Sequence, residues 1–261
     1  MAAMNTTHTP TTPLTVVTGG SRGLGRETAL RLAAQGHDVI LTYKSRDEEA
    51  QAVVKRIEAL GRRAAALPLD TGAIASFPAF VAQLAELLPA RFGRDSLDQL
   101  VNNAGIDWAA PIADSTEAQF DALMDVHFKG VFFLTQALLP RIADGGAIVL
   151  VSSGLTRFAI PGYAAYASMK GAIEVFAKYL AKELGTRRIR CNLVAPGAIE
   201  TDFTREAFET HAGMREFIAS QTALGRVGQP EDIAGVVAFL CSEGSRWMNA
   251  QRVEASGGIF L

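Results

Sequence analysis

The stretch that decides the fold is "LTVVTGGSRGLG", residues 14–25, in which an apolar run leads directly into a glycine-rich turn. The run predicts a buried strand, and the amphipathic pattern over 23–36 predicts a helix that ends at Gly36. The glycines permit a tight turn and let the backbone approach a pyrophosphate, while the free N–H groups at the helix start attract the anion. The stretch therefore predicts a nucleotide-binding strand–turn–helix unit.

The same alternation continues along the chain. Further strands are predicted over 38–43, 63–70, 97–105, 146–153, 189–197 and 251–258, with helices over 45–61, 74–90, 116–142 and 163–185. Ser45 and Glu48 show capping-box spacing at the second helix. Apolar strands separated by helices indicate an α/β fold, a Rossmann-type, doubly wound, seven-stranded parallel sheet with helices on both faces. No linker or repeat interrupts the pattern, so we expect a disordered lead over 1–13 and a single domain over 14–261.

The composition argues against several classes of protein. A 261-residue chain that is 49% hydrophobic and 20% charged fits a folded domain, and a net charge of −2 does not suggest a nucleic-acid binder. No apolar run reaches the roughly 18 residues of a membrane helix, and no secretory signal is recognisable, so we expect a cytoplasmic protein without a membrane partner. The dispersed histidines argue against a zinc site, and Cys191 and Cys241 are expected to be buried free thiols.

The end of the second strand bears on which dinucleotide is bound. NAD enzymes of this fold place an acidic residue there for the ribose 2′-hydroxyl. Here Tyr43 occupies that place, and Asp38 lies at the opposite end of the strand. Lys44 and Arg46, with Arg22 in the glycine turn, suit the 2′-phosphate of NADP. We therefore expect NADP(H) rather than NAD(H); the alternative is that these cations are simply solvated.

Four segments in order resemble the motifs of the short-chain dehydrogenase/reductase family: "TGGSRGLG" (18–25), "NNAG" (102–105), "YASMK" (166–170) and "PGAIETD" (196–202). The resemblance covers most of the chain after residue 13 and is strongest to 3-oxoacyl-[acyl-carrier-protein] reductase-like members. It implies an NADP(H)-dependent oxidoreductase that reduces a ketone to a secondary alcohol, and a homotetramer or homodimer. It also implies that the cofactor is contacted by Gly19, Ser21, Arg22, Gly23, Leu24, Gly25, Tyr43, Lys44, Ser45, Arg46, Asp70, Thr71, Asn103, Ala104, Gly105, Tyr166, Lys170, Pro196, Gly197, Ile199 and Thr201.

The stretch "YAAYASMK", residues 163–170, contains the proton-transfer pair that the resemblance implies. Residues four apart lie on one helix face, which pairs Tyr166 rather than Tyr163 with Lys170. A free phenol has a pKa of about 10, and we expect the lysine ammonium to lower it, so that Tyr166 acts as general acid near neutrality. The resemblance adds Ser153, thirteen residues before Tyr166, as a hydrogen-bond donor that polarises the substrate carbonyl.

Position 127 departs from the family pattern. Many relatives carry an asparagine there, in a water-mediated proton relay to the lysine, whereas this chain has His127 within "DVHFKG" (125–130). His127 holds the relay water through its carbonyl or imidazole, or shuttles the proton itself with a reference pKa near 6.5, or marks a decayed site in a nucleotide-binding regulator. We favour the first interpretation. An NAD-dependent alcohol or sugar dehydrogenase of the same family is a further alternative.

The substrate is expected to be a small carbonyl compound or alcohol with some apolar surface, such as an acyl thioester. The family places a substrate lid over 201–228, although an amphipathic helix packed on the core would show the same pattern. The residues predicted to line the pocket are Trp108, Phe158, Tyr163 and Phe203. Apolar residues beyond a one-sided stripe over 116–142 and 163–185 are compatible with a subunit interface.

Overall fold

A computed structural model describes residues 12–210 and 212–261, so the predicted lead lies outside the described residues except for its last two positions. Seven strands form one parallel sheet in the order β3-β2-β1-β4-β5-β6-β7. Their bounds are β1 Leu14–Val17, β2 Asp38–Tyr43, β3 Ala64–Pro68, β4 Leu97–Asn102, β5 Ile142–Val151, β6 Arg190–Pro196 and β7 Arg252–Ala255. The predicted seven-stranded, doubly wound sheet is therefore confirmed.

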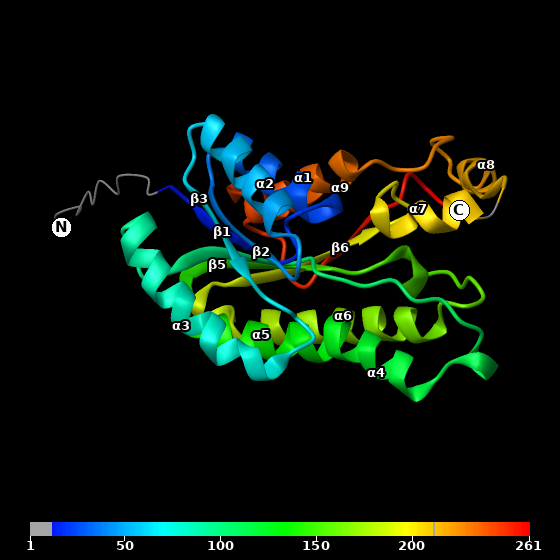
Figure 1. Ribbon diagram of the computed structural model, residues 1–261, viewed down its shortest axis with the longest axis horizontal. Helices are drawn as coiled ribbons and strands as arrows, with labels where there is room; N and C mark the ends of the chain where they lie inside the picture. The colour runs from blue at the N-terminus through cyan, green and yellow to red at the C-terminus, as the bar shows by residue number, and fades with distance from the viewer. Residues whose placement is uncertain (1–11, 211) are drawn as a thin grey trace.

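Helices cover both faces of the sheet (Figure 1). The upper layer in that view holds α1 (Gly23–Ala34), α2 (Asp47–Ala59) and α9 (Pro230–Cys241), and the lower layer holds α3 (Phe77–Leu87), α4 (Glu117–Met124), α5 (Gly130–Leu138) and α6 (Ala164–Glu183). Two shorter helices, α7 (Asp202–Thr210) and α8 (Met214–Ser220), follow β6 and lie near the C-terminus. Helix α9 was not predicted, although Pro230 at its first turn is a helix-start signal.

The core has two apolar layers, one on each side of the sheet. Neighbouring residues on a strand face opposite ways, so Val16 and Ile40 join the layer beneath α3, α5 and α6, while Val17 and Leu41 join the layer beneath α1, α2 and α9. All four side chains have no exposed surface. This two-sided burial is the reason that the strands read as continuous apolar runs.

The predicted helix over 116–142 is interrupted by a π-helical turn, Asp125–Lys129, which contains His127. The turn allows a close approach of Gly130 to the end of β3, because a Cβ added to Gly130 would lie 1.9 Å from the carbonyl oxygen of Thr71. Turns of this kind are frequent at functional sites. The capping box predicted for Ser45 and Glu48 is wrong, since α2 begins after Arg46 without a side-chain cap.

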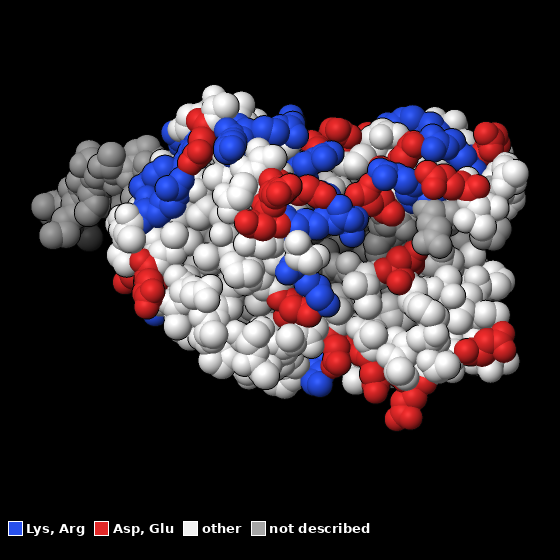
Figure 2. Space-filling model, viewed as in Figure 1, with Lys and Arg blue, Asp and Glu red and all other residues white. Residues whose placement is uncertain are grey.

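The helical stretch Glu117–Arg141 is long and apolar enough to cross a membrane by length and composition alone, which the sequence pattern did not lead us to expect. This is weak evidence, because core helices that cover a sheet pass the same test. Leu123, Leu134 and Leu138 on this stretch are fully buried within the protein. On the face shown in Figure 2, basic and acidic side chains are intermingled.

Candidate active site

The glycine turn after β1 packs tightly against the residues that follow β4. Gly19 has a φ of +64°, and a Cβ added there would lie 3.0 Å from the Cα of Ala104. A Cβ on Gly25 would lie 2.1 Å from the carbonyl oxygen of Gly19. Only glycine fits at these two positions, and the tight turn that they permit forms, with the first residues of α1, a cradle suited to a pyrophosphate.

Hydrogen bonds hold this cradle to the end of β4. The Asn103 side-chain amide donates to the carbonyl oxygens of Thr18 at 2.9 Å and Gly19 at 3.2 Å. The Thr18 hydroxyl in turn accepts from the backbone N–H groups of Asn103 at 2.9 Å and Ala104 at 3.0 Å. Thr18 was not among the predicted site residues, and its role here is to join two strand ends that are more than 80 positions apart in the sequence.

The cations predicted to select NADP lie at the surface, each beside a carboxylate. The pairs are Arg22 with Asp202 at 3.3 Å, Lys44 with Asp70 at 2.8 Å, and Arg46 with Glu49 at 2.5 Å. Asp202 also acts electrostatically on Arg46, which places two of the three cations around one carboxylate. Exposed ion pairs contribute little stability, so these cations are able to exchange a carboxylate for a phosphate.

The remaining predicted cofactor residues lie along the same carboxyl-end edge of the sheet. Pro196 ends β6, and a Cβ added to Gly197 would lie 2.9 Å from Ser256. Ile199 is buried, and Thr201 lies across from Gly23, with 3.7 Å between its side chain and a Cβ added there. The segment after β6 therefore lies beside the glycine turn.

Ser153, Tyr166 and Lys170 come together where β5 ends and α6 begins. Ser153 caps the short turn Gly154–Thr156, and its side chain shares a hydrogen bond with Tyr166. The Lys170 Nζ donates to the carbonyl oxygen of Val151 at 2.8 Å and lies 5.5 Å from the centroid of the Tyr166 ring. The structure thus brings the three predicted catalytic side chains together.

Burial raises the pKa of Tyr166 above its ordinary value, as does the nearby charge of Asp107, whereas the hydrogen bond with Ser153 lowers it. The expectation that Lys170 would lower the phenol pKa near to neutrality is therefore wrong for this structure. Burial lowers the pKa of Lys170 itself to about 7, and its amine is bound to the Val151 carbonyl. Tyr166 is consequently a neutral phenol at neutral pH, which is the form that a proton donor needs.

His127 is 1% exposed and lies edge-on to the Tyr166 ring, with 5.1 Å between ring centroids. Its Nε2 lies 2.8 Å from the carbonyl oxygen of Ile106 and 3.2 Å from the N–H of the same residue. The shorter contact assigns the proton to Nε2 and leaves Nδ1 as an acceptor. Nδ1 is buried and has no hydrogen-bond partner among the residues that the structure describes. Burial and the Lys170 charge lower the His127 pKa to about 3, so the value near 6.5 that the shuttle interpretation required does not hold.

The structure describes the side chains of three of the four predicted pocket residues. Tyr163 faces Tyr166 edge-on at 6.4 Å, and Trp108, in the loop after β4, is 40% exposed. Phe158 packs on Gly154, the residue after Ser153, and on Phe260 of the C-terminal segment, with 4.8 Å between the two ring centroids. The side chain of Phe203 lies outside the described part of the chain. The assignment of these four residues to a substrate pocket therefore stays a prediction.

Cys191 and Cys241 are buried free thiols, as predicted. Burial raises the pKa of both, that of Cys241 to about 12, so neither is reactive. Within residues 12–210 and 212–261, no group of three or more His, Cys, Asp or Glu side chains is arranged to hold a metal ion.

Sequence reasoning missed Glu174 and Arg252, which lie directly behind the Ser153 turn. The Glu174 carboxylate accepts from the Ser152 hydroxyl at 2.6 Å, and an Arg252 nitrogen donates to the carbonyl oxygen of Ser153 at 3.1 Å. The signal in the sequence was weak: Glu174 is an acidic residue in the predicted helix over 163–185, and Arg252 is a basic residue in the predicted strand over 251–258.

Comparisons with known proteins agree with this geometry. The family model described as enoyl-(acyl carrier protein) reductase matches residues 19–259. An uncharacterised oxidoreductase of Methylorubrum extorquens is 40% identical over 94% of this chain and 96% of its own. The 3-oxoacyl-[acyl-carrier-protein] reductase FabG of Staphylococcus aureus is 36% identical over 94% of this chain and 97% of its own.

Among solved structures, the angucycline C-6 ketoreductase LanV with bound NADP superimposes with a TM-score of 0.90 and 37% identity, covering 96% of each chain. The range matched by the family model, residues 19–259, contains Ser153, Tyr166 and Lys170. Both the sequence motifs and the fold therefore place this chain in the short-chain dehydrogenase/reductase family.

Proposed function

We propose that this protein reduces a ketone to a secondary alcohol with NADPH, and that Tyr166 donates the proton. The observation that carries the proposal is the cluster of Ser153, Tyr166 and Lys170 at the same edge of the sheet as the glycine cradle. A decayed regulatory site is disfavoured, because a protein that only binds a nucleotide has no need of a buried lysine beside a neutral phenol.

The cofactor fits the cradle on physical grounds. The glycine turn and the N–H groups at the start of α1 suit the pyrophosphate, and the exposed Arg22, Lys44 and Arg46 offer cations for the 2′-phosphate. LanV, which is similar over nearly the whole chain, is solved with NADP. When bound, NADPH supplies the hydride that reduces the carbonyl carbon.

The protein's own residues supply and stabilise the proton. The Ser153 and Tyr166 hydroxyls are close enough to share a hydrogen bond, so both are able to donate to one carbonyl oxygen between them. Tyr166 then gives up its proton to the developing alkoxide and becomes a phenolate. The Lys170 ammonium, 5.5 Å from the ring centroid, stabilises this anion, and its pKa of about 7 lets it pass a proton onward at neutral pH.

His127 takes the place of the relay asparagine as a neutral acceptor. Its imidazole is fixed by the Ile106 carbonyl, and its Nδ1 is a buried acceptor with no partner in the described part of the chain. Buried polar atoms of this kind are usually satisfied by ordered water. We therefore assign His127 the role of holding a water that links Lys170 to solvent, without becoming charged itself.

The substrate proposed is a ketone with apolar surface beside the carbonyl, either a 3-oxoacyl thioester or a polycyclic ketone. Trp108 and Tyr163 supply apolar rim, and the loops that carry them are joined by a backbone hydrogen bond from Ala110 to Gly162 at 2.9 Å. FabG of Staphylococcus aureus is named for the first substrate class and LanV for an angucycline ketone.

We further propose a homo-oligomer that forms through α5 and α6. Phe133, Val175 and Tyr179 on these helices are 39%, 53% and 62% exposed, which is more apolar surface than two covered helices usually leave in water. Light scattering after size-exclusion chromatography tests the oligomer, and Tyr179→Glu should reduce its mass.

We also propose that the protein is cytoplasmic, because the two buried, unpaired thiols Cys191 and Cys241 fit a reducing compartment.

The experiment that tests the proposed reaction is a screen of NADPH consumption over acetoacetyl and longer 3-oxoacyl thioesters, polycyclic aromatic ketones and simple ketones. An enoyl thioester belongs in the panel, because the matching family model carries the name of an enoyl reductase. Turnover of at least one ketone that is abolished in Tyr166→Phe supports the proposal. Turnover of the enoyl thioester alone would replace it with reduction of a carbon–carbon double bond.

A further inference from the structure

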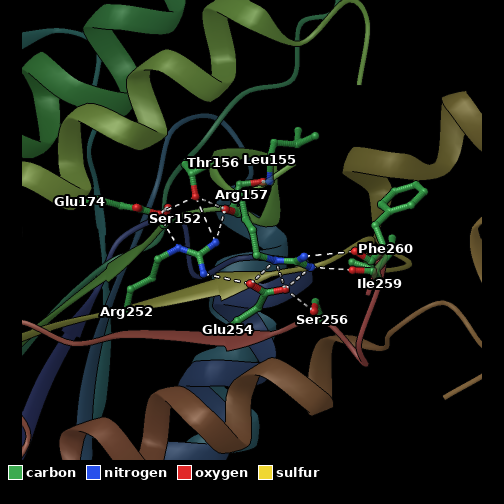
Figure 3. Close-up of polar contacts among 11 residues, drawn as sticks. Ser152, Leu155, Thr156, Arg157, Glu174, Arg252, Glu254, Ser256, Ile259 and Phe260 are labelled. Atoms are coloured by element: carbon green, nitrogen blue, oxygen red, sulfur yellow. Dashed lines mark hydrogen bonds and ion pairs between the residues drawn. The ribbon is translucent and has the colours of Figure 1, made fainter. Parts of the chain in front are cut away.

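We propose that Arg252 is a positioning residue that fixes the Ser153 turn for catalysis, from an edge strand two strands away. The inference rests on the proposed function, in which Ser153 donates to the substrate carbonyl. Arg252 opens β7, and the sheet order places β6 between β7 and the β5 strand that leads to Ser153. Figure 3 shows the Arg252 side chain extending from β7 toward Glu174 and Thr156.

The Arg252 guanidinium makes four contacts with well-defined geometry. It donates to Glu174 Oε1 at 2.8 Å, to Glu254 Oε2 at 3.0 Å, to the Thr156 hydroxyl at 3.0 Å and to the Ser153 carbonyl oxygen at 3.1 Å. The side chain is 23% exposed, so these bonds are only partly open to competition by water. One planar group therefore holds the backbone of Ser153 directly.

Glu174 binds the hydroxyls of two residues on either side of Ser153, Ser152 and Thr156. Its Oε1 accepts from the Ser152 hydroxyl at 2.6 Å and from the Thr156 hydroxyl at 2.7 Å (Figure 3). The Thr156 hydroxyl also contacts the Ser153 carbonyl oxygen at 2.9 Å. Since Glu174 lies one turn after Lys170 on α6, the network ties the Ser153 turn to the helix that carries Tyr166 and Lys170. It thereby fixes Ser153 relative to its partner in proton transfer.

A second ion pair holds Arg252 in place. Glu254 accepts from Arg252, from Arg157 at 2.7 Å and from the Ser256 hydroxyl at 2.7 Å. Arg157 continues to the carbonyl oxygens of Ile259 and Phe260, at 2.5 and 3.2 Å. The two arginines and the two glutamates balance in charge, and hydrogen bonding lowers the Glu254 pKa to about 2 despite its partial burial. Glu254 therefore stays ionised across the neutral range.

This arrangement needs an arginine. A guanidinium presents several donors in one rigid plane and reaches two carboxylates, a hydroxyl and a carbonyl at once, whereas a lysine ammonium is a point donor on a flexible stem. A shift of about 1 Å in a positioned group costs up to about 100-fold in rate. Loss of the Arg252 guanidinium should therefore displace Ser153, while the cofactor cradle at the ends of β1 and β4 stays intact.

The test is a double-mutant cycle between Arg252→Gln and Ser153→Ala, with kcat measured on a ketone that the wild type reduces. Arg252→Gln should lower kcat about 10- to 100-fold with the Kd for NADPH unchanged. In the Ser153→Ala background it should have no further effect on kcat, because the group through which it acts is gone. Arg252→Lys should restore the charge but only a small part of the rate.

Arg187→Gln is the matched control. Arg187 also bridges backbone carbonyls, those of Leu139 and Ile142, and the Asp144 carboxylate, but at the amino end of β5. It should lower the thermal midpoint and leave kcat unchanged. Glu174→Gln, which keeps the shape of the side chain, gives a second route to the same readout if Arg252→Gln does not fold.

The outcomes separate the two proposals. Unchanged kcat in Arg252→Gln or Glu174→Gln, or equal losses with and without Ser153, would overturn the positioning role. If instead Ser153→Ala itself retains full kcat, the proposed function of Ser153 is what fails. A loss in Arg187→Gln equal to that in Arg252→Gln would show that only general stability had been measured.

Discussion

The part of the molecule proposed to hold the dinucleotide and the part proposed to move the proton use charge in opposite ways. Around the glycine turn, Arg22, Lys44 and Arg46 are exposed and paired with carboxylates that solvent also reaches. Around β5 and α6, Lys170 and His127 are at most 5% exposed, and both have strongly lowered pKa values. Exposed charges exchange partners readily, which suits binding, whereas buried groups keep the protonation state that their surroundings impose, which suits catalysis.

The largest expected effect that would sharpen this contrast is that of Tyr166→Phe. The variant keeps the ring packed against His127 and Tyr163 but has no proton to donate. We expect kcat to fall about 10³-fold, as for loss of a general acid, with NADPH binding retained. Stopped-flow turnover and nicotinamide fluorescence measure the two quantities. Equal activity in this variant would remove Tyr166 from the mechanism.

The pH dependence of reduction should follow Lys170. Its pKa in the folded protein, about 7, lies below the ordinary value, so the ammonium that stabilises the phenolate is lost as pH rises above 7. We expect kcat/KM for reduction to fall about tenfold per pH unit above that value. Between pH 7 and the ordinary lysine pKa the unfolded chain binds more protons than the folded one, so this residue's contribution to stability rises with pH while activity falls.

A profile of kcat/KM between pH 5.5 and 9.5, together with urea unfolding at pH 7 and pH 9, checks both parts of the pH prediction. Lys170→Met provides the reference for stability, because it removes the titrating group. A flat activity profile through pH 9 would mean that the lysine proton is not needed, and a stability difference that persists in Lys170→Met would belong to another group.

The exposed cations should affect binding alone. Lys44→Ala and Arg46→Ala should each weaken NADPH binding roughly tenfold, as expected for one charge-assisted hydrogen bond, and leave NADH binding and the kcat with saturating NADPH nearly unchanged. Arg91→Ala is the control, because its exposed pair with Glu58 lies near Ala64 at the opposite end of β3. Fluorescence titration with both cofactors measures the effect. Equal or tighter binding of NADH by the wild type would reverse the assignment of NADP.

The smallest effect expected is that of His127→Asn. An asparagine amide also offers an acceptor and a donor, so we expect kcat to stay within about fivefold of the wild type, the value of one neutral hydrogen bond. His127→Leu, which offers neither, should lose more. Complete loss in the asparagine variant would show that the imidazole has a role that a held water does not explain.

The sequence alone was sufficient to predict individual strands and the pairing of residues on one helix. The β2 bounds predicted from 38–43 match Asp38–Tyr43, because a strand buried on both faces is a continuous apolar run with polar ends. The pairing of Tyr166 with Lys170 follows from helix geometry, since four residues make about one turn. The capping box at Ser45 failed because α2 begins only after Arg46, whose backbone is non-helical with φ −107° and ψ 69°. Side-chain spacing alone does not fix where a helix starts.

The sequence by itself determined the seven-stranded sheet, the glycine cradle and the pairing of Tyr166 with Lys170, because each depends on short-range periodicity or spacing. Ser153 was identified through the resemblance to the family. Only the tertiary structure decided the electrostatics. Burial set the pKa values of His127, in the turn between α4 and α5, and of Lys170 on α6. The sheet order brought Arg252 within reach of Glu174, 78 positions away. Burial and long-range contacts arise only when distant segments pack together, so they cannot be predicted from the local spacing of residues.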